Sequence, residues 1–475
     1  MPVFTSLTGA PTEISDAAVD TFAASLRGDL CPPGSDGYKT ARTLWNAMSD
    51  RHPALVVRAL GASDVQKAVT FARENGLLLA IRSGGHQIAG HAVADGALLL
   101  DLSLMRSVQV DPARQRAWVE PGALLGDVDK ETQAHALAVP TGINSTTGIA
   151  GLTLGGGFGW ITRKYGLTID NLLSARVVTA DGQVMTASAE ENQDLFWALR
   201  GGGGNFGVVT CFEFQLHRVG PEVLSGLVVH PLSAAETLLP AFARIADQAP
   251  DELTIWSVLR LAPPLPFLPE KWHGTPVLIF AACYVGDMEA GTQALSELRG
   301  LGTPIADVIG PHPFTGWQAA FDPLLTSGMR NYWKSHDFDS LPSEAISTLT
   351  ASITSLPDPS SEIFIAHLGG RMAMISETAT AFPSRAAHFV VNVHTRWEAP
   401  AQDESCIAWA RTLFDDLAPY AMGRVYVNFM PEDEAARLSG AYRGNMHRLH
   451  QVKTRYDADN LFRVNHNITP ENKSH

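Results

Sequence analysis

A glycine-rich turn reads RSGGHQIAG over residues 82–90 and directly follows a short apolar run, Leu77 to Arg82. The apolar run predicts a buried strand, and the small residues after it expose consecutive backbone N–H groups. Such a nest binds a pyrophosphate without needing a lysine. His86 follows the two glycines and would project toward the bound group. Taken alone, the stretch also fits an ordinary turn that ends in a solvated histidine.

A second glycine-rich stretch is free of charge across 21 residues and reads PTGINSTTGIAGLTLGGGFGW at 140–160. Charged side chains normally occupy surfaces, so this composition indicates burial against a flat or apolar partner. The hydroxyl groups of Ser145, Thr146 and Thr147 could bond ring carbonyls or phosphate oxygens. A buried loop between two helices is the alternative that the sequence leaves open.

A third glycine cluster contains Gly202, Gly204 and Gly207, which match the GxGxxG pattern of dinucleotide-binding folds. In those folds the pattern follows a strand and opens a helix. Here a predicted helix, residues 190–199, precedes the glycines and a predicted strand, residues 208–216, follows them. The order is reversed, so we reject NAD binding at this motif. Three glycine-dense loops still exceed what turns require and favour close approach of the backbone to a ligand.

The chain of 475 residues is long enough for two domains. Its first part alternates helices and strands, with a helix from Ser63, placed to cap it, to Asn75, and strands at 77–82, 96–102, 117–120 and 173–179. Beyond Pro221, strands are expected at 223–230, 253–261, 277–284, 362–367 and 388–397, with helices at 289–299, 404–417 and 432–455. Residues 262–269 are too rich in proline for a central strand and are expected to form a lid. The pattern predicts an α+β fold with an antiparallel sheet backed by helices.

The net charge, the cysteine spacing and the lengths of the apolar runs exclude several classes of function. The net charge is −14, so the surface repels phosphate backbones and no nucleic-acid partner is expected. Cys31, Cys211, Cys283 and Cys406 lack CxxC spacing, which favours neither disulfides nor a metal site. Residues 1–16 lack a basic region, so no secretory signal is expected, and the longest apolar run is too short to span a bilayer. We expect a soluble, cytoplasmic protein with no membrane partner.

Six motifs follow one another in a fixed order. They are RSGGH at 82–86, GGGFGW at 155–160, YGLTIDN at 165–171, DLFWALRGGGGNFGVVT at 194–210, YVNF at 426–429 and DADNLFRVNHNITP at 457–470. In this order they resemble the FAD-linked oxidase superfamily with the vanillyl-alcohol-oxidase type of flavin domain. Within that superfamily, the chain is most similar to the berberine-bridge-enzyme-like group. The resemblance extends over essentially the whole chain.

The resemblance implies that an FAD-binding domain of two α/β subdomains is split by an inserted substrate domain. The expected limits are 1–220 for the N-terminal part, 221–420 for the substrate domain, and 421–475 for a C-terminal segment that returns to the flavin domain. The implied FAD-binding residues are Arg82, Ser83, Gly84, Gly85, His86, Gln87, Gly142, Asn144, Thr146, Thr147, Gly148, Gly151, Gly156, Gly159, Val209, Asn465 and Asn467.

By the same resemblance, His86 bonds covalently to the 8α-methyl group of FAD. A neutral imidazole nitrogen is a competent nucleophile for this bond. Many relatives add a second bond from a cysteine to C6 of the flavin, but this chain has Asn144 at that place. Asparagine cannot form a thioether, so we expect a single covalent link. The small side chain of Thr147 implies room for dioxygen beside the flavin.

Three residues are candidates for the catalytic base. Relatives often carry tyrosine where this chain has Phe158 and Phe429, so two phenol hydroxyls are absent. Strand alternation places Asn392 and His394 on one face. An imidazole suits proton abstraction near neutral pH better than an amide. His394 and Tyr426 therefore rank ahead of Asn392, which is expected to position the substrate, although His394 and Tyr426 could each be purely structural.

The expected activity is that of an FAD-dependent oxidase or dehydrogenase. A carbon that carries a hydroxyl or amine would pass hydride to flavin N5, with dioxygen as the acceptor. The apolar lid, with Trp272 and His273 close behind it, favours an aromatic or apolar secondary metabolite over a sugar. The alternatives are a biosynthetic flavoenzyme that performs oxidative cyclisation, monooxygenation or elimination, and a binding protein that merely retains flavin. Substrate and oligomeric state stay open.

Overall fold

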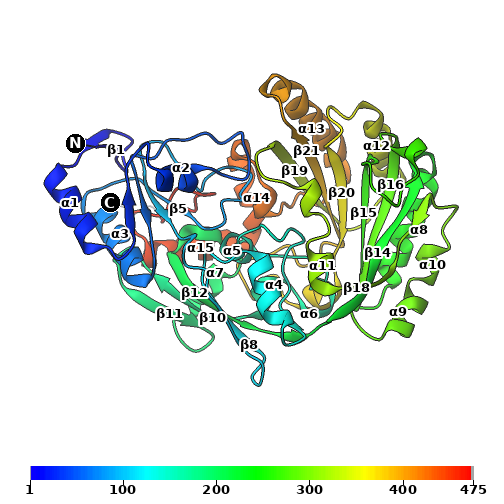
Figure 1. The fold of residues 1–475 in the computed structure, drawn as a ribbon, viewed down its shortest axis with the longest axis horizontal. Helices are drawn as coiled ribbons and strands as arrows, with labels where there is room; N and C mark the ends of the chain where they lie inside the picture. Colours follow the sequence, from blue (N-terminus) through cyan, green and yellow to red (C-terminus); the bar gives the residue numbers. More distant parts are fainter. Residues whose placement is uncertain (1, 472–475) are drawn as a thin grey trace.

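The computed structural model describes residues 2–471, and its first sheet is small and mixed. The sheet has the order β3-β4-β6-β5, formed by Asp29–Cys31, Leu55–Arg58, Leu98–Asp101 and Leu79–Arg82. β4, β6 and β5 pair in parallel, and parallel strands need a long crossover. The helix α3 (Ala62–Glu74) supplies it, and α1 (Asp16–Ser25) packs against α3 through the stacked rings of Phe22 and Phe71. The short pair β1 (Val3–Thr5) and β2 (Pro11–Glu13) and the helix α2 (Asp36–Arg42) complete this part (Figure 1).

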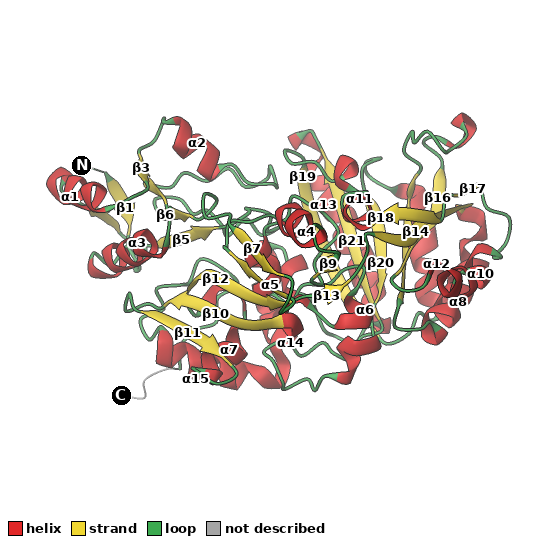
Figure 2. Ribbon diagram, turned by 60° about the horizontal axis from the view of Figure 1, so that its bottom comes forward, coloured by secondary structure: helices red, strands yellow, loops and turns green. Residues whose placement is uncertain are grey.

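A second sheet of five antiparallel strands has the order β11-β10-β12-β8-β7. Its strands are β7 (Val108–Asp111), β8 (Arg116–Val119), β10 (Leu172–Val178), β11 (Val184–Ser188) and β12 (Val208–Gln215). Residues of α4 (Leu125–Gln133), α5 (Ile149–Leu154), α7 (Gln193–Leu199) and α15 (Met446–Tyr456) share one apolar core with this sheet. The C-terminal helix α15 therefore packs with strands that precede it by more than 200 residues, as Figure 2 shows.

The third sheet is antiparallel and the largest, with the order β17-β14-β16-β15-β20-β21-β19 and β18 paired to β14. Its strands are β14 (Glu222–Pro231), β15 (Leu253–Leu261), β16 (Pro276–Tyr284), β17 (Ala306–Asp307), β18 (Gly310–Pro313), β19 (Arg330–Phe338), β20 (Glu362–His367) and β21 (Phe389–Trp397). Three helices, α8 (Ala235–Gln248), α12 (Ser343–Ser352) and α13 (Asp403–Leu417), cover one face and bury its alternate apolar residues. The predicted α+β fold with an antiparallel sheet backed by helices is confirmed.

The exact limits of the domains stay a prediction, but the packing shows which segments share a core. The large sheet begins at β14, close to the expected limit at residue 221. Val425, Leu449 and Ile468 belong to the core of the second sheet rather than to that of the third. A segment that follows the third sheet in sequence thus returns to the first half of the molecule (Figure 1).

Two predicted helices are interrupted in the structure, and a third begins at a different residue. The single helix expected at 432–455 is broken into a 3-10 turn (Glu432–Arg437), α14 (Leu438–Tyr442), a second turn (Arg443–Asn445) and α15. The break lies at Arg443, whose φ is 46°, and the Asn445 side chain fixes it by donating to the carbonyls of Glu377 (2.9 Å) and Thr380 (3.2 Å). The helix expected at 289–299 is divided at Leu295 into α9 (Met288–Ala294) and α10 (Ser296–Arg299).

The start of α3 also differs from the prediction. The helix begins at Ala62 with Gly61 as its N-cap residue, so Ser63 does not cap it. The Asp64 carboxylate instead accepts hydrogen bonds from the backbone N–H groups of Leu60 (3.0 Å) and Arg27 (2.8 Å). All four cysteines are free thiols. Each helix within residues 2–471 is too short or too polar to cross a bilayer.

Candidate functional site

A cavity of about 800 Å³ lies between the glycine loops and the uncovered face of the large sheet. This volume is within the range of about 300–1,000 Å³ that is usual for ligand sites. The cavity is lined at one end by residues of the loops at 83–87, 142–151 and 203–209 and of the tail at 464–466. At the other end it is lined by alternate residues of β15, β16, β20 and β21. The two ends therefore come from different sheets.

The first two glycine loops touch each other through their backbones. A Cβ atom on Gly84 would lie 2.5 Å from Cα of Gly148, so neither position tolerates a side chain. Close packing of the two loops therefore requires glycine at both positions, and both also line the cavity. Gly151 and Gly204 also line the cavity, and nothing in residues 2–471 lies within 4 Å of where their Cβ atoms would stand. At these two positions the missing side chains leave room for a bound molecule.

His86 lines the cavity beside the first loop. Its ring stacks on Trp45, with the centroids 4.2 Å apart and the planes at 21°. Burial, with smaller contributions from Arg396 and His394, lowers the pKa of His86 to about 3. The Nε2 atom is buried, and no hydrogen-bond partner for it occurs in the described part of the chain. At neutral pH the imidazole is therefore uncharged and available as a nucleophile.

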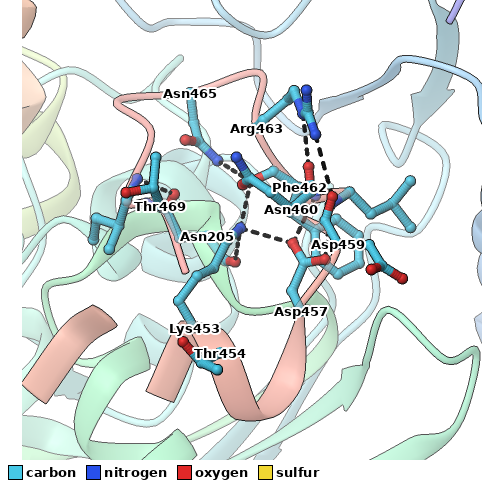
Figure 3. Close-up of polar contacts among 12 residues, drawn as sticks. Asn205, Lys453, Thr454, Asp457, Asp459, Asn460, Phe462, Arg463, Asn465 and Thr469 are labelled. Carbon is cyan, nitrogen blue, oxygen red and sulfur yellow. Dashed lines mark hydrogen bonds and ion pairs between the residues drawn. The ribbon is translucent and has the colours of Figure 1, made fainter. Parts of the chain in front are cut away.

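The tail reaches the cavity because a buried ion pair holds it. Lys453 is fully buried, and its ammonium group donates to Asp457 (2.7 Å), the Asn205 carbonyl (2.8 Å) and the Phe462 carbonyl (2.9 Å) (Figure 3). The Asn465 amide donates to the same Phe462 carbonyl at 3.1 Å. A buried ammonium with three acceptors is well satisfied. This network fixes the turn that brings Asn465 and His466 to the cavity wall.

A polar row crosses the uncovered face of the large sheet. Arg260 on β15 pairs in register with Glu362 on β20, Glu362 with His394 on β21, and His394 with Trp333 on β19. The Arg260 guanidinium donates to Glu362 at 2.6 Å, and Nδ1 of His394 lies 3.4 Å from the other carboxylate oxygen. All four side chains line the cavity. The other ring nitrogen of His394, Nε2, lies 3.3 Å from Oδ1 of Asn331 on β19, so both ring nitrogens have a polar neighbour.

The charges of the row are set by burial and mutual contact. Burial alone would raise the pKa of Glu362, but Arg260 and then His394 and Arg396 outweigh it and lower the pKa to about 2. Burial lowers the pKa of His394, and the contact with Glu362 opposes that shift. At neutral pH the row therefore contains a cation, an anion and an uncharged imidazole. That imidazole can take up a proton.

Aromatic side chains form the wall between the two ends. Trp160 stacks on Trp256 with centroids 4.3 Å apart, and Trp317 tilts against Trp160 at 5.1 Å. Phe158 and Phe429 lie edge to face at 5.8 Å. Buried aromatic rings bind flat apolar ligands through large contact areas. The wall thus fits a ring system better than a flexible polar chain.

Tyr426 belongs to this wall, and its hydroxyl already has two partners. It accepts a hydrogen bond from the Gly157 N–H (3.0 Å) and one from the Asn428 amide (2.9 Å). Burial raises its pKa to about 12. A phenol in this state does not ionise near neutral pH, but its own proton remains available for donation.

Two families match the segments of the chain that supply the loops and the tail of the cavity. Residues 53–188 match the family described as FAD binding domain, and residues 425–469 match the family described as Berberine and berberine like. The chain is 32% identical over 464 residues to (R)-6-hydroxynicotine oxidase of Paenarthrobacter nicotinovorans, which covers 94% of this chain and 98% of that protein. It is 31% identical over 458 residues to an FAD-linked oxidoreductase of Dictyostelium discoideum, covering 95% and 97%.

The chain belongs to the berberine-bridge-enzyme-like FAD-linked oxidoreductases. The crystal structure of 6-hydroxy-D-nicotine oxidase from Arthrobacter nicotinovorans superimposes with a TM-score of 0.84 at 29% identity, covering 94% of this chain and 99% of that one. The resemblance inferred from the six motifs is thereby confirmed, as are an FAD-binding fold and an oxidoreductase activity.

The residues of this berberine-bridge-enzyme-like chain fit a bound flavin. Gly151 and Gly204 leave open space in the cavity wall, and the His86 imidazole is uncharged. The Oδ1 atom of Asn465 and the Nε2 atom of His466 are buried and find no hydrogen-bond partner among residues 2–471. Buried polar atoms without partners are costly. A flavin, which carries polar atoms along its ring and chain, is the kind of ligand that would satisfy them.

The structure brings most of the predicted site residues together. The residues that line the cavity are Ser83, Gly84, Gly85, His86, Gln87, Gly142, Asn144, Thr147, Gly148, Gly151, Val209, Asn465, Asn392, His394 and Tyr426. As alternation predicts, Asn392 and His394 face the cavity, whereas Val391 and Val393 enter the helix-backed core. Their roles remain predictions.

Five predicted cofactor residues do not line the cavity: Arg82, Thr146, Gly156, Gly159 and Asn467. The Arg82 guanidinium turns away to the buried carboxylate of Asp101 (3.2 Å). The exposed Thr146 donates to the Asn144 side-chain oxygen at 2.6 Å. A Cβ atom on Gly159 would lie 1.9 Å from the Thr141 carbonyl, so Gly159 is required for backbone packing.

Sequence reasoning missed several cavity residues, chiefly Trp45, Arg260, Trp333, Glu362 and His466. Strand alternation along β20 could have predicted that Glu362 faces the cavity, because Glu362 and Phe364 lie on the same face of the strand. The rejected GxGxxG loop also lines the cavity through Gly203, Gly204 and Gly207. Its reversed context is confirmed, since α7 precedes it and β12 follows it. The loop thus contributes to the site without a Rossmann geometry.

Proposed function

We propose that this enzyme oxidises a C–OH or C–N group of a small apolar or aromatic molecule by hydride transfer, with dioxygen as the electron acceptor. The observation that carries the proposal is the row of Arg260, Glu362 and His394, which places an uncharged imidazole in a mostly apolar cavity. When bound, FAD supplies a hydride acceptor at N5. The reaction then needs a residue that takes the proton of the adjacent O–H or N–H group.

His394 takes that proton in the proposed mechanism. Its lowered pKa keeps the imidazole unprotonated at neutral pH. Glu362, which lies 3.4 Å from Nδ1, stabilises the positive charge that develops on the ring. Asn392 has a buried Oδ1 atom for which the described residues offer no partner, so it can accept a hydrogen bond from the substrate. Tyr426 acts as a hydrogen-bond donor rather than as a base, because its pKa is about 12.

The aromatic wall supports a flat substrate. Trp160 packs against both Trp256 and Trp317 in the apolar cavity wall beside the polar row. Leu265 and Phe267, from the expected lid at 262–269, also line the cavity. Relatives of this chain are named (R)-6-hydroxynicotine oxidase and tetrahydroberberine oxidase, and both names state ring-containing substrates. We therefore propose aromatic amines and alcohols as the substrate class.

We further propose that FAD is held by one covalent bond, through His86. The lack of charge on His86 supports its role as nucleophile. Asn144 lines the cavity, and its amide donates to the Leu325 carbonyl at 3.3 Å. An amide cannot replace the thiolate that a cysteinyl bond requires. Thr147 lines the same wall, and its small side chain supports the proposal of dioxygen as the acceptor.

The test of this function combines three measurements on the purified enzyme. Acid-precipitated protein should remain yellow, and a flavin peptide should contain His86 and no cysteine. Anaerobic addition of aromatic amines or alcohols should bleach the flavin, and air should restore its colour within seconds. Reoxidation over many minutes would indicate a dehydrogenase. A ring-closed or oxygenated product would favour a biosynthetic flavoenzyme, for which the replacement of two tyrosines by Phe158 and Phe429 in the cavity is the supporting observation.

A further inference from the structure

We propose that Trp45 is a positioning residue that holds His86 for covalent attachment of the flavin. This inference rests on the covalent link proposed above. The two rings stack at 4.2 Å with nearly parallel planes, so Trp45 covers one face of the imidazole. The side chain of Trp45 is 5% exposed, and both residues line the cavity. A stacked neighbour of this size leaves the imidazole ring little freedom to swing out of its plane.

Trp45 can act as a support because it is itself held from two sides. Its backbone N–H donates to the carbonyl of Gly85 (3.0 Å), in the loop that carries His86. Its indole N–H donates to the Leu325 carbonyl (3.1 Å), and its own carbonyl accepts from the Gly328 N–H (3.1 Å). Leu325 and Gly328 precede β19 of the large sheet. The indole therefore links the cofactor loop to the substrate side of the cavity.

Two further contacts fix the plane of the indole. The Arg396 guanidinium lies 5.2 Å from the centre of the Trp45 ring, within the range of a cation–π contact. Trp333 meets the same indole edge to face at 5.8 Å. The contacts of Trp45 thus restrain both its position and its rotation. A ring restrained in this way transfers its orientation to the imidazole stacked on it.

Trp45 also shields one face of the His86 ring from solvent. In the described part of the chain, two titratable or charged side chains affect the pKa of His86. They are Arg396 and His394, both on β21, and each lowers this pKa by disfavouring the protonated imidazole. Burial adds the largest contribution in the same direction. Removal of the indole would admit solvent to the stacked face, and the pKa of His86 would return toward its ordinary value of about 6.5.

In the covalent step, the flavin methyl group is oxidised and the flavin ring is reduced. The His86 nitrogen forms a bond to the 8α-carbon, one C–H bond of that methyl group breaks, and the imidazole gives up its N–H proton. The flavin ring takes up the corresponding two electrons and two protons. Dioxygen, the acceptor named for the overall reaction, then reoxidises the ring and leaves as hydrogen peroxide. Trp45 forms no bond in this step and acts only through the orientation and protonation of His86.

The experiment compares the full-length wild type with Trp45→Leu, Trp45→Phe, Trp333→Leu and His86→Ala. Each protein is produced under riboflavin limitation and then given FAD, and acid-stable flavin is followed over time from pH 5 to pH 8. Non-covalent FAD binding is measured separately by fluorescence quenching. Trp45→Leu should bind FAD but attach it about 10- to 100-fold more slowly, as expected for a displaced reacting group. Trp45→Phe keeps a flat ring and should restore most of the rate.

The pH profile separates positioning from a general structural role. Wild-type attachment should vary little between pH 5 and pH 8, because the pKa of His86 is about 3. In Trp45→Leu the rate should fall from pH 8 to pH 5, by at most about 30-fold, which is the fall for an imidazole of ordinary pKa. Trp333→Leu removes a cavity tryptophan that touches Trp45 but does not stack on His86, so it should slow attachment far less than Trp45→Leu and keep the wild-type pH profile.

The outcomes distinguish the two proposals. If wild-type protein releases all its FAD on denaturation, the covalent link proposed above is wrong. If wild type retains FAD and Trp45→Leu attaches it at the same rate with the same pH profile, Trp45 is not a positioning residue. If Trp333→Leu loses attachment as severely as Trp45→Leu, or if Trp45→Phe fails to restore the rate, the effect is general disruption of the cavity and the inference is overturned.

Discussion

Replacement of Glu362 by glutamine tests the proposed base most directly. The substitution removes the carboxylate between Arg260 (2.6 Å) and His394 (3.4 Å) but preserves the size and shape of the side chain. In the resting enzyme the imidazole is uncharged, so its attraction to Glu362 is weak. When His394 takes the substrate proton, the contact becomes an ion pair. The interaction is therefore strongest in the transition state, which is the condition for a catalytic effect.

The expected magnitude follows from the strength of that contact. A hydrogen bond to a charged group contributes about 1.5–3 kcal/mol. With about 1.4 kcal/mol for each factor of ten in rate, the loss corresponds to flavin reduction that is about 10- to 150-fold slower. The separation of 3.4 Å is long for an N–H···O contact, which favours the lower end of that range.

The same substitution should shift the pH profile in a defined direction. Flavin reduction falls as pH drops through the pKa of His394, because the protonated ring accepts no proton. In the wild type that fall should lie below pH 6.5, since burial lowers this pKa. Glu362 raises the pKa of His394 against that trend. Without the carboxylate the acid limb should therefore move to still lower pH, even though the rate at neutral pH is reduced.

Anaerobic stopped-flow bleaching of the flavin at several pH values measures both effects. Glu434→Gln is a matched control, because Glu434 is also buried and paired, with Lys334 (2.8 Å) and Arg437 (2.7 Å), but does not line the cavity. Both variants should lower the melting temperature, since each leaves a buried cation without its partner. Unchanged bleaching in Glu362→Gln, or an acid limb that moves to higher pH, would refute the role of the row.

Three further predictions concern other parts of the site. His394→Ala should slow flavin reduction about 10²- to 10⁴-fold, while acid-stable flavin remains at the wild-type level. Tyr426→Phe should slow flavin reduction less than tenfold. Equal rates of flavin reduction in His394→Ala and the wild type would exclude His394 as the base. Lys453→Met should destabilise the fold by about 3–5 kcal/mol in chemical denaturation and lower the fraction of protein that incorporates flavin, whereas Lys39→Met, at a side chain that is 66% exposed, should do neither. Photoreduced wild type should reoxidise in air within seconds, whereas Thr147→Leu, with a bulkier wall, should reoxidise more slowly when absorbance is followed.

Local patterns predicted the parts of the site that lie within one element. Alternation along β21 placed Asn392 and His394 on the cavity face, and the uncharged run at 140–160 did line the cavity. The partners of His394 were not predictable, because strand order in an antiparallel sheet depends on pairing between distant segments. Glu362 and Arg260 precede His394 by 32 and more than 100 residues, and only the order β15-β20-β21 brings them into one row.

Other residues escaped prediction for different physical reasons. Trp45 lies in irregular chain between α2 and β4, where no periodicity signals which side chains are buried. Arg82 belongs to a motif that suggests a cofactor contact, yet the buried carboxylate of Asp101 attracts its guanidinium. The periodic pattern at 432–455 suggested one helix, but the buried amide of Asn445 anchors the chain at its break. In each case a tertiary contact outweighs the local preference.

The cavity wall is complete only after synthesis of the C-terminal tail, which the buried Lys453 holds in place. His86 and His466 stand in the same cavity wall, although about 380 residues separate them along the chain. At the usual elongation rate of about 5–20 residues per second, the ribosome completes the second half of that wall about 20–75 s after the first. In this interval the core of the second sheet lacks α15 and the cavity lacks its tail, so the nascent chain cannot enclose a flavin. Cofactor uptake is thus a late event in the maturation of each molecule, and the supply of flavin matters after translation rather than during it.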